Sequence, residues 1–320
     1  MKKILVIGSA GQIGSELVVK LRDLYGKEHI VATDKCPNAG EKLAETGIFE
    51  ILDIVDRVAL ESICNKYQVT HIINMAAILS AVGEKKPMLA WDVNMNGLLN
   101  VLEVARELNI EQVLVPSSIA VFGPETPVDN TPQETILLPK TMYGITKAAG
   151  ELLCDYYVRR FGMDVRGLRY PGIISNETLP GGGTTDYAVA IYYDAVKYKK
   201  YTCFVKEDTR LPMMYMPDCL KATIDLFQAD FSKLKHHSNF NLNSMSFTVK
   251  ELADSIKKYI PDFEIDYKPD FRQEIADTWP NSVDDSAARD EWGWKPSYDL
   301  DAMTQDMLRA IGEKHKQGLI

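Results

Sequence analysis

The chain has 320 residues, and its 36 Lys and Arg against 45 Asp and Glu give a formal net charge of −9. An apolar fraction of 46% and a charged fraction of 25% are typical of globular proteins and exclude a disordered or fibrous chain. The negative charge disfavours nucleic acid as a partner, and no apolar run approaches the ~18 residues that span a bilayer.

The first half of the chain alternates short β-branched runs with helical patterns. This alternation predicts βαβ units and a doubly wound parallel sheet, hence the α/β class. We expect strands at 3–7, 30–34, 48–53, 71–74, 112–116 and 164–169, and helices at 12–25, 56–67, about 88–108 and 142–161.

The pattern changes after Tyr170, where Pro171-Gly172 and the run 180–183 indicate an irregular connection. Thr248 and Glu251 have the spacing of a capping box at the start of an amphipathic helix. Beyond the connection we expect helices at 187–198, 218–227, 248–259 and from about 300, and short strands at 201–205, 212–215 and 239–242.

A glycine-rich turn, Gly8-Ser9-Ala10-Gly11-Gln12-Ile13-Gly14, directly follows the first strand and opens the first helix. Such glycines let the backbone approach a pyrophosphate, which the helix N-terminus binds. Asp34 ends the second strand 20 residues later, where a carboxylate binds the adenosine ribose and repels a 2′-phosphate. The turn and Asp34 therefore predict NAD as the cofactor. The neighbouring Lys35 would also contact the cofactor, although its positive charge acts against the preference for NAD over NADP, and Asp53-Ile54 would flank the adenine.

Tyr143 and Lys147 are four residues apart, so on a helix they share a face. A nearby ammonium lowers the pKa of a phenol, and we therefore expect Tyr143 to act as a general base. Ser117-Ser118 follow the strand at 112–116, at the edge where parallel sheets bind ligands. Met75-Ala76-Ala77 follow another strand and leave room for close packing against a cofactor.

Taken together, these motifs resemble the extended short-chain dehydrogenase/reductase superfamily, which implies a Rossmann-type fold. The resemblance implies that Tyr143 is the acid/base, that Lys147 binds the nicotinamide ribose, and that Ser118 rather than Ser117 orients the substrate oxygen. It rests on motifs that follow the order of that superfamily: Gly8–Gly14, Asp34, Asn74–Ala77, Ser118 with Phe122-Gly123, Tyr143 with Lys147, and Leu168-Arg169-Tyr170-Pro171, in which Tyr170 would line the cofactor site.

Three further segments resemble the epimerase-like L-threonine 3-dehydrogenases: 76–84, 171–187 and 275–294. This resemblance implies NAD-dependent oxidation of the L-threonine C3 hydroxyl to 2-amino-3-oxobutanoate, and a homodimer packed through the helices near 88–108 and 142–161. It places Thr185 at the substrate carboxylate and Trp279 against the methyl group. The implied substrate-binding residues are Ser80, Ser118, Tyr143, Thr184, Thr185 and Trp279, and no residue is assigned to the substrate ammonium.

Two other functions are compatible with the motifs. A nucleotide-sugar 4-epimerase or dehydratase would hold a diphosphate with basic residues such as Arg210 or Arg272, but the Asn common after the matching Tyr is missing at Tyr170-Pro171-Gly172. A non-catalytic NAD-sensing protein would typically have lost Tyr143 or Lys147.

The expected organisation is an NAD-binding Rossmann domain at 1–172, joined by about 215–243, with a smaller mixed α/β substrate lobe at about 173–214 and 244–320. The five cysteines include no C-x-x-C pair and the five histidines have no ligand spacing, so we expect reduced thiols and no metal. Residues 2–7 run directly into a strand with no secretory pattern, which predicts a cytoplasmic protein. The resemblance implies a small-molecule substrate.

Overall fold

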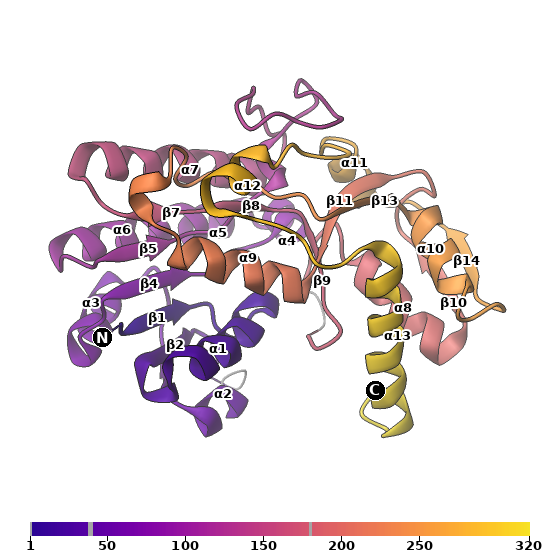
Figure 1. Ribbon diagram of the computed structural model, residues 1–320, viewed down its shortest axis with the longest axis horizontal. Coiled ribbons are helices and arrows are strands. Elements are labelled where there is room, and N and C mark those ends of the chain that lie inside the picture. The colour runs from indigo at the N-terminus through magenta and orange to yellow at the C-terminus, as the bar shows by residue number, and fades with distance from the viewer. Residues whose placement is uncertain (1, 38–40, 179–180) are drawn as a thin grey trace.

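The computed structural model describes residues 2–37, 41–178 and 181–320, and its centre is a parallel sheet (Figure 1). Six strands lie in the order β3-β2-β1-β4-β5-β7, and every pairing between them is parallel. They are β1 (Ile4–Ile7), β2 (Ile30–Asp34), β3 (Phe49–Ile51), β4 (His71–Asn74), β5 (Gln112–Leu114) and β7 (Val165–Arg166). The predicted α/β class with a doubly wound sheet is confirmed.

Helices cover both faces of this sheet because alternate residues of β1 point to opposite sides. Leu5 and Ile7 pack with α3 (Arg57–Tyr67), α6 (Gly97–Glu107) and α7 (Met142–Phe161). Ile4 and Val6 pack on the other face, where the cluster includes residues of α1 (Gln12–Tyr25), α2 (Glu41–Thr46) and α9 (Met216–Gln228).

The expected helix at about 88–108 contains an irregular turn. It comprises α5 (Pro87–Trp91), a π-helical turn at Asp92–Asn96, and then α6. The π turn turns Asn94 inward, where its amide bonds the backbone of Ile78 and the hydroxyl of Thr146. A local helical pattern carries no signal for such a turn, which usually marks a functional region.

Two expected strands are also divided, at the same level of the sheet. The run 112–116 ends as β5, and Ser117–Ser118 form β6 in a separate three-stranded sheet; likewise 164–169 divides at Gly167 into β7 and β8 (Leu168–Tyr170). A Cβ at Gly167 would lie 2.5 Å from the carbonyl oxygen of Val115. The close approach of the two chains at Gly167 therefore coincides with the break.

The second half of the chain contributes two further small sheets. β9 (Gly172–Ile174), β11 (Arg210–Tyr215) and β13 (Met245–Thr248) form one, and β10 (Lys200–Cys203) with β14 (Glu264–Tyr267) form the other. The expectation of an irregular chain at Gly172 was wrong, because β9 pairs in parallel with β11. The remaining helices are α4 (Ser80–Lys85), α8 (Tyr187–Tyr198), α10 (Val249–Lys257), α11 (Phe271–Ala276), α12 (Ser286–Trp292) and α13 (Leu300–Lys316).

Part of the segment at about 215–243 packs against the main sheet, and its strand joins the separate three-stranded sheet of β6 and β8. Helix α9 packs on the face that α1 covers, and β12 (Phe240–Asn241) pairs with β8. The expected boundaries at 172, 215 and 243 stay a prediction. Within the described ranges, no helix is long and apolar enough to cross a membrane.

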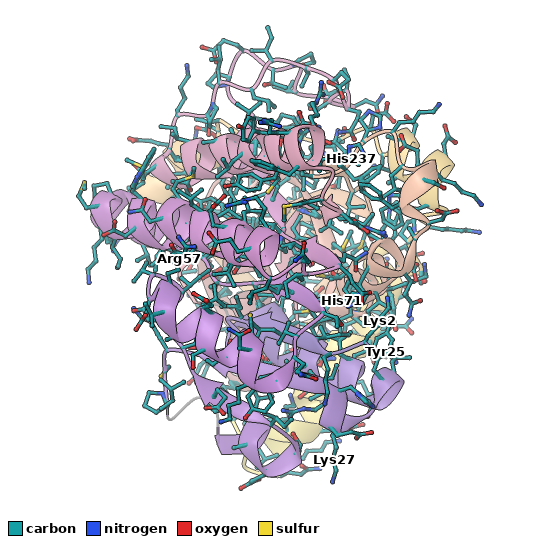
Figure 2. The ribbon with its side chains drawn as sticks, turned by 90° about the vertical axis from the view of Figure 1, so that its left-hand side faces the viewer. Lys2, Tyr25, Lys27, Arg57, His71 and His237 are labelled. Atoms are coloured by element: carbon teal, nitrogen blue, oxygen red, sulfur yellow. The ribbon has the colours of Figure 1, made fainter. Side chains whose placement is uncertain are left out.

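Figure 2 shows the end of the sheet at which the strands begin. His71, the first residue of β4, is buried there against Phe227, and burial lowers its pKa to about 4. The carboxyl ends of the strands, where the predicted site residues lie, are at the opposite end.

A buried ion pair ties α7 to the strand layer. Glu151 on α7 accepts hydrogen bonds from the Arg169 guanidinium at 2.9 and 2.8 Å and from the Ser117 hydroxyl at 2.5 Å. Both charged side chains are at most 5% exposed. Removing one partner of such a pair leaves the other charge buried without compensation.

We therefore expect Glu151→Ala to lower the free energy of unfolding by about 3–5 kcal/mol, measured by urea denaturation. The matched control is Asp225→Ala, which breaks the half-exposed pair Lys221–Asp225 on α9 and should cost less than about 1 kcal/mol. Similar losses in the two variants would contradict a structural role for the buried pair.

Candidate active site

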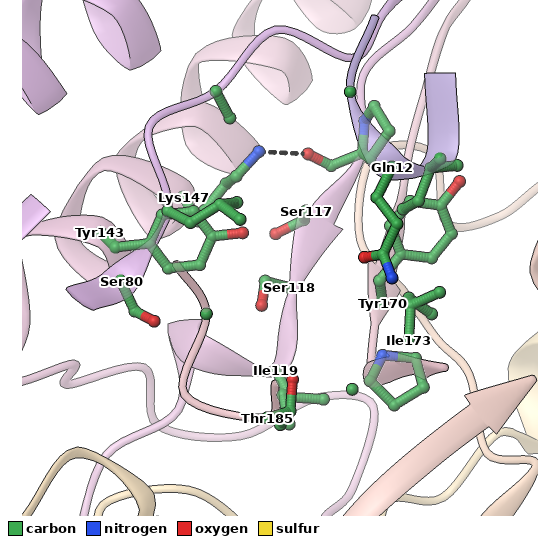
Figure 3. A pocket seen from close by; sticks show the side chains of 18 of the residues that line it. Gln12, Ser80, Ser117, Ser118, Ile119, Tyr143, Lys147, Tyr170, Ile173 and Thr185 are labelled. Carbon is green, nitrogen blue, oxygen red and sulfur yellow. Dashed lines mark hydrogen bonds between the residues drawn. The ribbon is translucent and has the colours of Figure 1, made fainter. Parts of the chain in front are cut away.

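A long cleft runs across the carboxyl ends of the central strands, and Figure 3 shows its larger cavity. It consists of two cavities of about 220 and 200 Å³ that share four lining residues, Gly8, Gly11, Met75 and Ala77. The larger cavity is also lined by the predicted residues Gln12, Ile13, Gly14, Ser80, Ser118, Tyr143, Lys147, Tyr170, Thr184, Thr185 and Trp279. The smaller one is lined by the predicted residues Asp34, Lys35, Asp53, Ile54 and Ala76.

The glycine-rich turn forms the floor between the two cavities. Gly8 has φ +76°, and a Cβ there would lie 2.6 Å from the backbone nitrogen of Ala76. A Cβ at Gly14 would lie 2.3 Å from the Gly8 carbonyl oxygen, so the chain can turn this tightly into α1 only with glycine at both positions. The glycines therefore leave the backbone N–H groups of the turn uncovered by side chains at the N-terminus of a 14-residue helix, where an anion binds well.

This part of the cleft fits a dinucleotide. No side chain of the described residues caps the N-terminus of α1, and the side-chain nitrogen of Gln12 is buried there without a hydrogen-bond partner among them. Asp34 at the end of β2 accepts hydrogen bonds from the backbone of Ala10 and Cys36, both at 3.0 Å. Its carboxylate is thus fixed beside the turn, in the position expected for a ribose ligand.

Helix α7 brings Tyr143 and Lys147 to the larger cavity. The Thr141 hydroxyl caps the helix by accepting a hydrogen bond from the Gly144 nitrogen at 3.0 Å. A Cβ at Gly144 would lie 2.2 Å from the carbonyl oxygen of Ala120, so the first turn of α7 touches the segment that follows Ser118. This contact brings the Tyr143 phenol into the space that Ser118 also faces (Figure 3).

Lys147 lies beside Tyr143 in the same cavity. Its ammonium donates a hydrogen bond to the Pro116 carbonyl oxygen at 2.7 Å, and its nitrogen lies 5.7 Å from the centre of the Tyr143 ring (Figure 3). Burial lowers the pKa of Lys147 to about 8, although Cys154 and Glu151 act in the opposite direction.

The expected direction of the Tyr143 pKa was wrong. Burial raises the pKa of Tyr143 to about 12, and only the hydrogen bond with Ser118 lowers it. Desolvation of the phenolate exceeds any stabilisation from Lys147, whose ammonium is itself desolvated and bound to a carbonyl oxygen. Sequence spacing places a cation near a phenol but carries no information about burial.

In the same cavity, Ser80 lies beside Tyr143 (Figure 3), and its side chain and that of Thr184 bind each other. Their hydroxyl oxygens lie 3.0 Å apart, and both residues are at most 2% exposed. The Thr185 methyl group packs where a Cβ at Gly172 would be, at 2.8 Å, so glycine at 172 leaves room for it. Trp279 is buried at the edge of the same cavity.

Tyr170 lines the cavity with its ring because its hydroxyl group is bound elsewhere. Its hydroxyl shares a 2.5 Å hydrogen bond with Thr223 on α9, which leaves the ring to line the cavity. Several other lining residues received no role from the sequence, because they contribute backbone or apolar surface; among them are Leu79, Pro116, Ile119 and Ile173. Asp186 also lines the cavity, and the signal for it is an acid three residues after the last glycine of the run.

The fold and this arrangement define a nucleotide-dependent oxidoreductase of the short-chain dehydrogenase/reductase type. The family model described as "NAD dependent epimerase/dehydratase family" matches residues 4–242. The chain belongs to the NAD-dependent epimerase/dehydratase family.

Three similar proteins span nearly the whole chain. An uncharacterized epimerase/dehydratase of Staphylococcus saprophyticus is 51% identical over 318 residues, 99% of both chains. The L-threonine dehydrogenase of Clostridium difficile is 55% identical, with a TM-score of 0.95 and 98% of each chain covered. A monomeric L-threonine 3-dehydrogenase from a metagenome is 50% identical, with a TM-score of 0.93 and 97% of this chain and 99% of that chain covered.

We expect Gly14→Ala to weaken NADH binding by about 100-fold, because the added methyl group collides with the Gly8 carbonyl oxygen and displaces the turn. Fluorescence titration with NADH measures this loss. Gly312→Ala on α13 is the matched control, since a Cβ there meets nothing within 4 Å. Unchanged NADH affinity in Gly14→Ala would show that the turn does not hold the dinucleotide.

Proposed function

We propose that this protein is an NAD-dependent L-threonine 3-dehydrogenase, which oxidises the C3 hydroxyl of L-threonine to 2-amino-3-oxobutanoate. The observation that carries the proposal is the 55% identity over 98% of both chains with an L-threonine dehydrogenase. The cleft supports it, because every site residue that the sequence predicted lines this cleft.

The cleft would hold NAD along its length. The turn Gly8–Gly14 would bind the pyrophosphate and Asp34 the adenosine ribose, and the negative charge of Asp34 would repel the 2′-phosphate of NADP. Asp53, Ile54 and Lys35 would flank the adenine; the Lys35 ammonium lies 3.8 Å from the Asp53 carboxylate. The strand-end residues Met75–Ala77 would pack against the cofactor, and Tyr170 would line its nicotinamide end.

The reacting groups are Tyr143, Ser118 and Lys147. Ser118 donates a hydrogen bond to the C3 oxygen and holds it beside the phenol. Tyr143 removes the hydroxyl proton, so the C–O bond becomes a carbonyl as the C3 hydrogen departs with its electron pair. Lys147 binds the ribose hydroxyls next to the reacting carbon. The bound nicotinamide supplies the acceptor for that hydride.

Other hydroxyl and aromatic residues of the cavity recognise the amino acid. Thr185 binds the substrate carboxylate, supported by the hydroxyl pair of Ser80 and Thr184, and Trp279 covers the methyl group. Small hydroxyl side chains suit a small zwitterion, since they bind its carboxylate without a large desolvated counter-charge.

A nucleotide-sugar 4-epimerase or dehydratase is the less favoured alternative. Both arginines that could hold a diphosphate are bound elsewhere: Arg210 bonds Glu251 and the Ser246 carbonyl oxygen, and Arg272 pairs with Asp270. Neither lines the cleft. A non-catalytic NAD-sensing protein is disfavoured because Tyr143, Lys147 and Ser118 are all retained in one cavity.

The assembly proposed from the resemblance is a homodimer through α5, α6 and α7. Leu98, Val101, Leu102 and Ala105 cover the sheet, so they are not available to a partner. The same helices nevertheless expose apolar side chains that suit an interface, namely Met88, Trp91, Leu99, Ile145, Leu152 and Tyr156. One similar enzyme is described as monomeric, and light scattering distinguishes a mass of 36 kDa from twice that value.

We place the protein in the cytoplasm. Its five cysteines are free thiols, four of them buried, which suits a reducing compartment. The described residues hold no group of three or more His, Cys, Asp or Glu that could bind a metal ion, and the mechanism uses no metal.

The direct test follows NADH absorbance with L-threonine, D-threonine and UDP-sugars supplied in parallel with NAD. NADH formation with L-threonine supports the proposal, whereas turnover of a UDP-sugar without turnover of L-threonine would replace it with the epimerase-type function.

Tyr143→Phe should reduce turnover by about three orders of magnitude or more, because the variant lacks the base. Affinity for NADH should remain within about threefold, since the ring is retained. Tyr198→Phe, at an exposed position on α8, is the control and should keep wild-type turnover. Near-normal turnover in Tyr143→Phe would remove Tyr143 from the base role.

Ser118→Ala should shift the pH dependence of turnover to higher pH by about one unit. The base must be ionised, and the hydrogen bond with Ser118 lowers the Tyr143 pKa, so its loss raises that pKa and the rising limb moves up. Ser117→Ala is the neighbouring control, because the Ser117 hydroxyl is bound to Glu151. An equal shift in both variants, or a shift to lower pH, would contradict this role.

A further inference from the structure

The glycine-rich run before α8 surrounds a carboxylate. The backbone nitrogens of Gly182 and Gly183 donate hydrogen bonds to Asp186 Oδ2 at 3.0 and 2.9 Å. Gly182 has φ +102°, which favours glycine, and a Cβ at Gly183 would lie 2.7 Å from Asp186 Oδ1. The run is therefore glycine because it folds closely around this one side chain.

The Asp186 side chain does not serve the helix it precedes. It is the N-cap residue of α8, but it makes no capping hydrogen bond. Its second oxygen, Oδ1, has no hydrogen-bond or ion-pair partner among the described residues, while the residue lines the cavity beside Thr184 and Thr185. One carboxylate oxygen thus anchors the side chain and the other remains available for a ligand.

Few charged side chains line the larger cavity. Of the described residues that line the larger cavity, Asp186 is the only acid and Lys147 the only base. Arg272 attracts the Asp186 carboxylate from a distance, but its own guanidinium pairs with Asp270 and stacks on Phe204. Burial raises the pKa of Asp186 even though two backbone N–H groups lower it, so its negative charge is only partly compensated.

We infer that Asp186 Oδ1 binds the α-ammonium group of the substrate and thereby selects amino acids over hydroxy acids. This assignment rests on the proposed function and supplies the ligand for the one charged group of L-threonine that the sequence left without a partner. Neighbouring Thr185 and Asp186 then receive the carboxylate and the ammonium of the same zwitterion.

The selection follows from burial. Asp186 is half-buried in the free protein. A substrate that covers its carboxylate but lacks the ammonium leaves this charge desolvated without a counter-charge, which is unfavourable. (R)-3-Hydroxybutanoate has the same carbon chain and the same C3 configuration as L-threonine but no amino group. The enzyme should therefore reject it although its reacting hydroxyl is identical.

The test is Asp186→Asn, assayed with L-threonine and with (R)-3-hydroxybutanoate. The amide oxygen of Asn can still accept from Gly182 and Gly183, so the loop is retained and only the charge is lost. We expect kcat/KM for L-threonine to fall about 100-fold, chiefly through KM, while kcat/KM for (R)-3-hydroxybutanoate stays constant or rises. NADH affinity should not change.

Asp194→Asn on the same helix is the matched control, because Asp194 is half-buried but does not line the cavity. Equal losses for both substrates in Asp186→Asn would show a merely structural role, and an unchanged preference for L-threonine would also overturn the assignment. If the wild-type protein oxidises no L-threonine, the proposed function itself fails; if it does and the preference is insensitive to Asp186, only this inference fails.

Discussion

The hydrogen bond from the Lys147 ammonium to the Pro116 carbonyl oxygen joins the catalytic helix to the end of the sheet. It connects α7 to the chain just before Ser118, so the three polar groups of the reaction share one support. The contact between Gly144 and Ala120 and the Glu151–Arg169 ion pair hold the same two layers together along the helix. The geometry of the site therefore depends on how closely α7 approaches the ends of β5 and β6.

This close approach also sets the electrostatics of the cavity. Burial raises the pKa of Tyr143 and lowers that of Lys147, so both groups favour their neutral forms more than they would in water. The hydrogen bond with Ser118 lowers the pKa of the Tyr143 phenol and so opposes the effect of burial. In the same cavity, two backbone N–H groups bind one oxygen of Asp186, and burial raises the pKa of this carboxyl. A small zwitterion placed between these groups would meet one charge of each sign.

Elements with strong local signals were predictable from the sequence. The bounds of α1, α7 and α8 match the expected ranges, and the capping box of Thr248 and Glu251 is present at α10. The break at Gly167, the strand at Gly172–Ile174 and β14 were not predicted, because each depends on a partner distant in sequence. A strand of three or four residues carries little periodicity of its own.

The site, too, combines features with a local sequence signal and features that depend on segments distant in sequence. The spacing of Gly8–Gly14 and of Tyr143 with Lys147 is local, and these residues do line one cleft. The direction of the Tyr143 pKa and the environment of Asp186 depend on burial by other segments, which sequence spacing does not contain. Ser80 and Thr184, 104 residues apart, form a pair that only the folded chain reveals.

The central claim is that the C3 hydrogen of L-threonine leaves as hydride. The most direct measurement uses L-threonine deuterated at C3 with NAD and examines the reduced nicotinamide by NMR. The account predicts that the deuterium is found at the nicotinamide C4 and that turnover is slowed by the isotope if this step limits the rate. Deuterium in the solvent, with none in the reduced nicotinamide, would contradict it.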